Sequence, residues 1–100
     1  MQITYHVDYQ YKLHGDDRPV ASGSVMRSSA EETPVMFLPA EGDFVEINGN
    51  PTHDDTLTSF RGRVVSRLFR YERQSEMEVF CHINIIVEEC AQDFTRLVSE

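Results

Sequence analysis

Residues 60–89 read FRGRVVSRLFRYERQSEMEVFCHINIIVEE, and this stretch decides the fold. In its later half, apolar residues occupy every second position: Met77, Val79, Cys81, Ile83, Ile85 and Val87. A period of two places alternate side chains on one face of a β-strand. Residues 60–73 alternate in a similar way, and almost nothing separates them from residues 76–89. The stretch therefore predicts a long β-hairpin.

The two alternating patterns also predict how the hairpin strands pair. The inner face of the first strand is expected to hold Phe60, Gly62, Val64, Ser66 and Leu68. Even-numbered residues must then face odd-numbered ones, which requires a connecting loop with an even number of residues. With a loop of Gln74 and Ser75, or of residues 73–76, this register pairs Phe69 with Phe80, Arg67 with His82 and Arg61 with Glu88. The neighbouring registers with an even loop shift these partners by two. Gly62, placed opposite Val87, would mark a bend or the close approach of another chain segment.

The outer face of this hairpin has an unusual composition for a surface that meets solvent. It combines cationic, aromatic and aliphatic side chains, namely Arg61, Arg63, Val65, Arg67, Phe69 and Tyr71 on the first strand and Phe80 and Ile86 on the second. Contiguous apolar groups on an exposed face are typical of protein interfaces. We therefore predict a non-catalytic protein-interaction module that self-associates, as a homodimer, through these eight residues.

Charge is distributed unevenly along the chain. The formal net charge is −8, yet five of the nine basic residues lie on residues 60–73: Arg61, Arg63, Arg67, Arg70 and Arg73. Such a cluster indicates either a patch for a partner or cross-strand ion pairs with Glu76, Glu78 and Glu88.

Arginines that alternate with aromatic residues also suggest an alternative function. Arg61, Arg63 and Arg67 together with Phe69 and Tyr71 have the residue types of surfaces that stack bases and contact phosphates. RNA or single-stranded DNA is therefore the alternative partner. The acidic balance of the whole chain disfavours a general nucleic-acid coat.

The remaining sequence predicts a single domain, residues 1–100, of the all-β class. Residues 3–13 and 20–27 read as an antiparallel hairpin around a turn at 14–19, and residues 35–38 and 43–48 as short extended segments. Residues 28–34 and 49–59 read as loops. Three-and-four spacing in residues 90–100 predicts a short helix, expected to cover the outer hairpin face. The architecture expected is a small antiparallel open barrel or a curved sheet of five to six strands.

No set of residues predicts catalysis, a cofactor or a metal. The four histidines lack the spacing of chelating pairs, and His53, Asp54 and Asp55 form the one cluster that merits a metal titration. Nucleophile motifs and phosphate-binding glycine loops are absent from the sequence. A hydrolase or metal site at residues 53–55 stays open as a third hypothesis.

Cysteine usage and hydropathy bear on the cellular compartment. Cys81 and Cys90 form no CxxC motif, and Cys81 falls on the apolar side of its strand, as a buried free thiol would. The chain lacks the long apolar stretch of a signal peptide or membrane span. The expected location is the cytoplasm, without a membrane partner.

One pattern resembles a known group of proteins. Residues 38–47 read LPAEGDFVEI, followed by GRVVSR at 62–67 and INIIVEE at 83–89. This arrangement resembles small uncharacterised bacterial β-barrel proteins with an LPxxGDxV pattern, in which a proline and a Gly-Asp turn open a strand. The resemblance implies a compact barrel or sheet, and it carries no catalytic residue.

Overall fold

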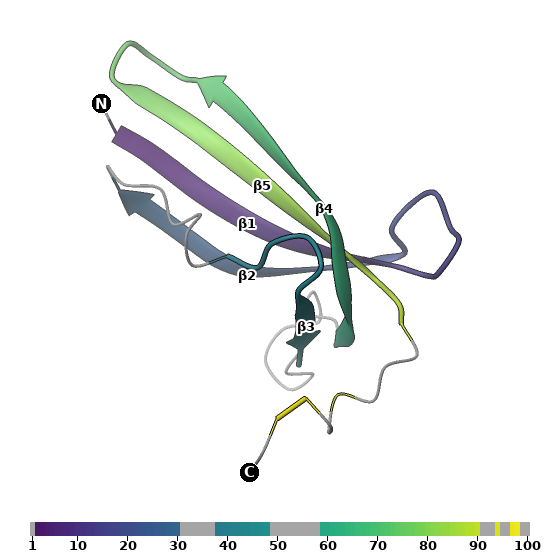
Figure 1. Ribbon diagram of the computed structural model, residues 1–100. Helices are drawn as coiled ribbons and strands as arrows, with labels where there is room; N and C mark the ends of the chain where they lie inside the picture. The colour runs from purple at the N-terminus through teal and green to yellow at the C-terminus, as the bar shows by residue number, and fades with distance from the viewer. Residues whose placement is uncertain (1, 31–37, 49–58, 91–93, 95–96, 99–100) are drawn as a thin grey trace.

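The computed structural model describes residues 2–30, 38–48, 59–90, 94, 97 and 98. For residues 23–30 it describes the backbone only. Five strands form one sheet (Figure 1). They are β1 (Gln2–Lys12), β2 (Ala21–Ala30), β3 (Phe44–Ile47), β4 (Phe60–Arg73) and β5 (Glu78–Glu88). Their order across the sheet is β2-β1-β5-β4-β3. The predicted all-β curved sheet is confirmed.

The sheet is mixed, and this corrects the prediction of purely antiparallel strands. β1 and β5 run parallel along their whole length, from Gln2 beside Glu78 to Lys12 beside Glu88. The three other strand pairs are antiparallel. Alternation within a strand fixes which side chains share a face, but it does not determine which strand edges meet. The parallel pair at the centre of the sheet therefore had no signal in the sequence.

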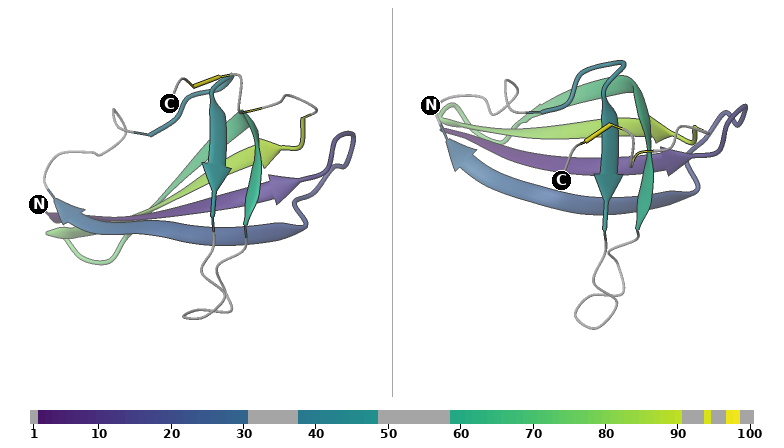
Figure 2. Two further views of the ribbon diagram at one scale, coloured as in Figure 1. Left: turned by 90° about the horizontal axis from the view of Figure 1, so that it is seen from below. Right: turned by 60° about the horizontal axis from the view of Figure 1, so that its bottom comes forward.

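The sheet curls into a half-barrel (Figure 2). Its core lies on the concave face. The rings of Tyr11 on β1 and Phe60 on β4 stack with their centroids 5.3 Å apart, although β5 lies between these strands. In a flat sheet, strands two apart are separated by about 9 to 10 Å. Strong curvature therefore brings these rings together. The buried core comprises Tyr5, Val7, Tyr9, Leu38, Phe60, Val64, Cys81, Ile83, Ile85 and Val87.

The N-terminal hairpin forms as predicted. The amide of Val20 donates to the carbonyl oxygen of Tyr11 at 2.7 Å, which closes the connection between β1 and β2. Gly15 has φ +86°, a left-handed conformation that glycine adopts without steric cost. β2 extends to Ala30, beyond the predicted residues 20–27.

The Gly-Asp pattern also forms the turn expected of it. The amide of Asp43 donates to the carbonyl oxygen of Ala40 at 3.0 Å, and Gly42 has φ +95°. A positive φ at the third position of such a turn favours glycine. The carboxylate of Asp43 accepts the amide of Ala40 at 2.8 Å and so stabilises the turn that opens β3.

The C-terminal segment differs in part from the prediction. Most of the predicted helix at 90–100, like most of the loop at 49–59 and the segment 31–37, falls outside the described residues. The part that is described contains no helix, and the amide of Leu97 donates to the carbonyl oxygen of Phe94. Phe94 contacts Phe44 of β3 and the guanidinium of Arg61, so it does not cover Phe69 or Phe80 as expected.

Candidate partner-binding site on strand β4

β4 is long, but its outer neighbour β3 is short. β3 pairs with β4 from Phe44 opposite Arg63 to Ile47 opposite Phe60. Two further backbone hydrogen bonds, from Gly42 to Val64 and from Val64 to Asp43, extend this contact as far as Val64. Beyond that point no described strand lies beside β4 on its outer side, as Figure 1 shows. We call residues 66–73 the β4 edge.

A β-bulge at Val65 reverses the faces of β4. Val64 lies opposite Val87, but Ser66 lies opposite Ile86, so Val65 is an extra residue. An extra residue shifts every later side chain to the other face of the sheet. From that point Arg67, Phe69 and Tyr71 lie opposite core residues, namely Ile85, Ile83 and Cys81.

The bulge overturns the predicted single outer face. Arg61 and Arg63 lie on the convex face, where Arg63 is the register neighbour of Glu88 in the strand pair, while Val65 sits at the bulge itself. Phe80 and Ile86 lie on the convex face of β5, which alternates with its buried core positions. Arg67, Phe69 and Tyr71 lie on the concave face with the core. The eight predicted residues thus divide between opposite sides of the sheet.

The predicted hairpin register is wrong between the turn and the bulge, because the loop has an odd number of residues. Arg73 lies opposite Val79, so five residues, 74–78, connect the pair, an odd number. Odd-numbered residues therefore face odd-numbered ones from the turn to the bulge. Even faces odd only beyond the bulge, as in Val64 opposite Val87. The predicted pairs of Arg67 with His82, Phe69 with Phe80 and Arg61 with Glu88 are not formed, and Arg61 lies opposite Glu46.

The close approach expected at Gly62 is confirmed, although with another neighbour. A Cβ atom at Gly62 would collide with the carbonyl oxygen of Glu88 and come within 3.0 Å of the Val87 side chain. Glycine is needed here because the backbones of β4 and β5 meet closely beside the bulge.

The β4 arginines contact neutral groups. Arg61, Arg63 and Arg67 each lie over an aromatic ring, with the guanidinium carbon 5.6 to 5.8 Å from the centroid. Arg63 also donates to the carbonyl oxygen of Gly42, and Arg70 donates to the Asn84 side-chain oxygen at 2.9 Å. Between described residues, ion pairs form only at Glu88, with Lys12 and His14. The expected pairs with Glu76, Glu78 and Glu88 are therefore not formed in this part of the chain.

The β4 edge also exposes apolar surface on both faces. Leu68 on the convex face is 53% exposed, and Tyr71 on the concave face is 60% exposed. Phe69, between them, is partly buried against the core. Tyr71 lies opposite the buried Cys81, which agrees with its position on the core side. The edge thus combines cationic groups with two exposed apolar side chains.

The convex face also holds a pair of histidines that the sequence spacing does not reveal. His6 on β1 and His82 on β5 are neighbours in the parallel pair, with ring centroids 5.6 Å apart. Phe80 lies against His82 at 4.7 Å, and Arg70 is the neighbour of His82 on β4. No group of three or more potential metal ligands occurs in the described parts of the chain. The His53–Asp55 cluster lies outside them.

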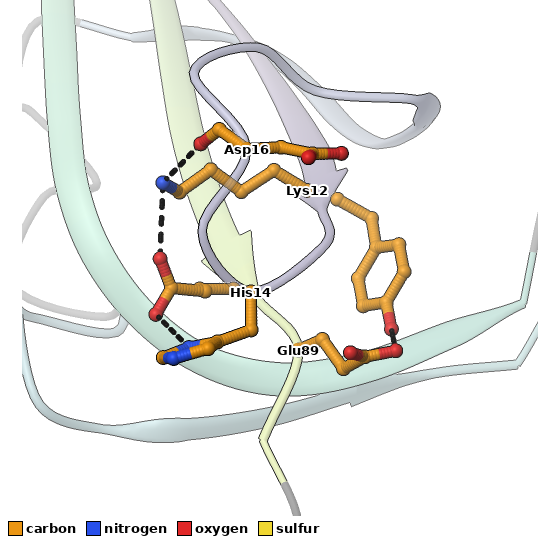
Figure 3. A network of polar contacts seen from close by, with 6 residues as sticks. Lys12, His14, Asp16 and Glu89 are labelled. Atoms are coloured by element: carbon orange, nitrogen blue, oxygen red, sulfur yellow. Dashed lines mark hydrogen bonds and ion pairs between the residues drawn. The ribbon is translucent and has the colours of Figure 1, made fainter.

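A polar network joins the β1–β2 turn to the end of β5 (Figure 3). The carboxylate of Glu88 contacts the Lys12 ammonium at 3.0 Å and the His14 ring at 3.2 Å. Lys12 also donates to the carbonyl oxygen of Asp16, and the Tyr11 hydroxyl donates to Glu89. The hydrogen bond from Lys12 lowers the pKa of Glu88 below its usual value. This network joins the sheet to the turn, and both carboxylate oxygens of Glu88 have a partner in it.

An open groove of about 900 Å³ adjoins this network. It is lined by His14, Glu41, Gly42, Arg63, Val64, Val65, Glu88, Glu89 and Cys90. Its charged groups have mixed signs, and Glu88 is held by Lys12 and His14. The groove therefore presents neither a consistent charge nor a nucleophile paired with a base.

The predicted state of Cys81 is confirmed. Its thiol is free and fully buried, and burial raises its pKa above the usual value. A raised pKa keeps the thiol protonated at neutral pH and so unreactive. Cys90 is also free and is partly exposed.

Comparison with known proteins adds no assignment, since no family model, curated protein or solved structure matches the chain. A search of the described segments for a helix long and apolar enough to cross a membrane found none.

Proposed function

We propose that the protein is a non-catalytic protein-interaction module that binds an acidic partner through the β4 edge. One observation carries the proposal: Arg67, Arg70 and Arg73 form no ion pair with any described carboxylate. Cationic groups left without an internal counter-charge favour an anionic partner by complementary electrostatics. Exposed Leu68 and Tyr71 supply apolar contact area beside these charges.

The geometry favours a protein partner over nucleic acid. Binding to single strands uses exposed aromatic faces on which bases stack. Phe69 packs against the core and has Arg67 over its ring, so among the described residues of this face only Tyr71 presents a largely exposed aromatic ring. The net charge of −8 also repels a polyanion more strongly than a short acidic peptide.

The predicted mode of self-association loses its structural basis. A continuous interface needs its anchors on one surface, and the bulge separates Arg67, Phe69 and Tyr71 from Phe80 and Ile86. The module proposed here therefore binds a different chain. Self-association itself stays a prediction, which light scattering over a range of concentrations tests.

The test uses a peptide of four Glu-Val repeats, acetylated and amidated, with its Lys-Val counterpart as the charge control. We expect the acidic peptide to bind at low salt, to bind more weakly as salt rises, and to outcompete the basic peptide. Arg73→Gln should weaken binding about two- to five-fold, the range of one exposed ion pair. Arg18→Gln is the matched control, because Arg18 is exposed in the β1–β2 turn and the variant removes the same charge.

Two results would reject the proposal. One is equal binding of the acidic and basic peptides, or equal effects of Arg73→Gln and Arg18→Gln. The other is tighter binding of a labelled oligothymidine of similar length, lost in Arg67→Gln, which would assign the surface to nucleic acid instead.

A further inference from the structure

We infer that the partner binds by adding a β-strand to the β4 edge, an inference that rests on the proposed function. In this mode the acidic segment is extended and is held by backbone hydrogen bonds. Its side chains supply the selectivity. Strand addition is an established mode of peptide recognition, in which main-chain bonds give affinity and alternate side chains give specificity.

The first support is that the backbone of the β4 edge has no partner on its outer side among the described strands. Residues 66–73 are in β conformation and pair with β5 on one side, from Ser66 opposite Ile86 to Arg73 opposite Val79. On the other side the last described partners are Gly42 and Asp43, both bonded to Val64. An edge strand exposes a row of free N–H and C=O groups. Residues 66–73 therefore offer a template of roughly 25 Å for another strand.

The second support is the distribution of side chains over the two faces. The concave side carries Arg67, Phe69, Tyr71 and Arg73, and the convex side carries Leu68, Arg70 and Glu72. A strand laid beside β4 would place its own alternate residues next to each of these sets. In a segment where acidic and apolar residues alternate, all the carboxylates would share one face, beside Arg67 and Arg73, and the apolar residues would share the other face, beside Leu68. The occupant is thus an extended segment that mixes acidic and apolar residues.

A second copy of β4 does not fit this description. Each copy brings three arginines and one glutamate to the edge, so pairing two copies concentrates like charges along one row. Like charges directly opposite one another destabilise a strand pair. The arginines therefore disfavour pairing of β4 with the β4 of a second copy, as charged residues commonly do on edge strands. They do not disfavour pairing with an acidic strand.

The experiment uses the peptide of four Glu-Val repeats in three forms. One form is unmodified, one carries N-methyl groups on every Glu and one on every Val. In an added strand, only alternate backbone amides point toward β4. We expect one methylated form to bind at least ten-fold more weakly than the other, because it cannot donate to β4 and clashes with it. The two forms have identical composition and charge, so each is the control for the other.

Hydrogen exchange of the full-length protein provides the second measurement. On addition of the unmodified peptide, alternate amides within residues 66–73 should become protected, while those on the free edge of β2 should not change. Ionic binding without strand addition would leave both methylated forms equally tight and the β4 amides unprotected. That result would overturn this inference and leave the proposed function standing.

The remaining outcomes are equally decisive. If no form of the peptide binds, the proposed function and the inference both fail. If the protein alone shows concentration-dependent protection of residues 66–73 together with a doubled mass in solution, the occupant is a second copy, and the inference of an acidic partner is wrong.

Discussion

Phe69 lies directly opposite Ile83, a residue with no exposed surface, so its ring belongs to the concave side of the half-barrel. The pairing follows from the bulge at Val65, which moves all later β4 side chains to the other face. It places Arg67 and Tyr71 beside the core and Leu68 and Arg70 on the convex surface. The chemistry of the β4 edge depends on this reversal.

The reversal predicts which of two adjacent apolar residues stabilises the fold. Phe69→Ala should lower the free energy of unfolding by about 2 kcal/mol, since Phe69 packs partly against the core. Leu68→Ala should cost less than about 1 kcal/mol, because half of that side chain is exposed. Urea unfolding of both variants measures the difference. A larger loss for Leu68→Ala would mean that β4 has no bulge.

Gly62 should tolerate no side chain. In Gly62→Ala the new methyl group would meet the Glu88 carbonyl oxygen, a backbone atom that cannot rotate away. We expect a loss of about 2 to 3 kcal/mol in the free energy of unfolding, the usual range for overpacking. Ser66→Ala, at an exposed position on the same strand, is the control and should change it by less than about 0.5 kcal/mol. Equal stability of the two variants would contradict the close approach of β4 and β5.

The Glu88 network predicts a dependence on pH. Because the folded-state pKa of Glu88 is lowered, mainly by Lys12, its carboxylate stabilises the fold above its unfolded pKa. That stabilisation is lost as pH falls through the folded-state value. The wild type should therefore exceed Glu88→Gln in urea midpoint at about pH 6, and the difference should shrink toward about pH 3. A difference that is constant or grows at acid pH would refute this role of Glu88.

The two thiols should react at different rates with a thiol reagent. Cys90 is partly exposed, whereas Cys81 is fully buried with a raised pKa. One thiol should react quickly in the native protein and the second only after denaturant is added. Cys90→Ser should remove the fast phase and Cys81→Ser the slow one. Rapid reaction of Cys81 in the native state would show that the concave core is open to solvent.

The sequence alone predicts much of the local structure. Strict alternation from Ile3 onward is enough to predict β1, and the positive-φ turn at Gly42 follows from the Gly-Asp pattern. These features depend on neighbours in the chain, which short-range patterns encode. The all-β class of the curled sheet follows from them.

The sequence does not predict the bulge, because the apolar residues of β4 allow either set of alternate side chains to face the core after Val65. Val64 and Val65 are adjacent apolar residues, and so are Leu68 and Phe69. Either parity can therefore be continued past Val65, and only the pairing with β5 decides between them. The eight predicted residues were assigned to one face of the hairpin, whereas the structure divides them between the two faces of the sheet.

The sequence also did not indicate that His6 and His82 are neighbours. These residues are far apart in the chain, and the parallel pairing of β1 with β5 alone brings their rings together. Parallel pairing leaves no turn sequence between its strands, so neither spacing nor composition indicates it.

The most direct test of the account is hydrogen exchange by NMR on the free, full-length protein. An open β4 edge predicts an alternating pattern over residues 66–73, with slow amides bonded to β5 and fast amides facing outward. Arg63 and Val64 have neighbours on both sides, β5 on one and residues 42–44 on the other, so their amides should both exchange slowly. Slow exchange at every amide from 66 to 73 would mean that another part of the chain already covers the edge, and the proposed binding site would not exist.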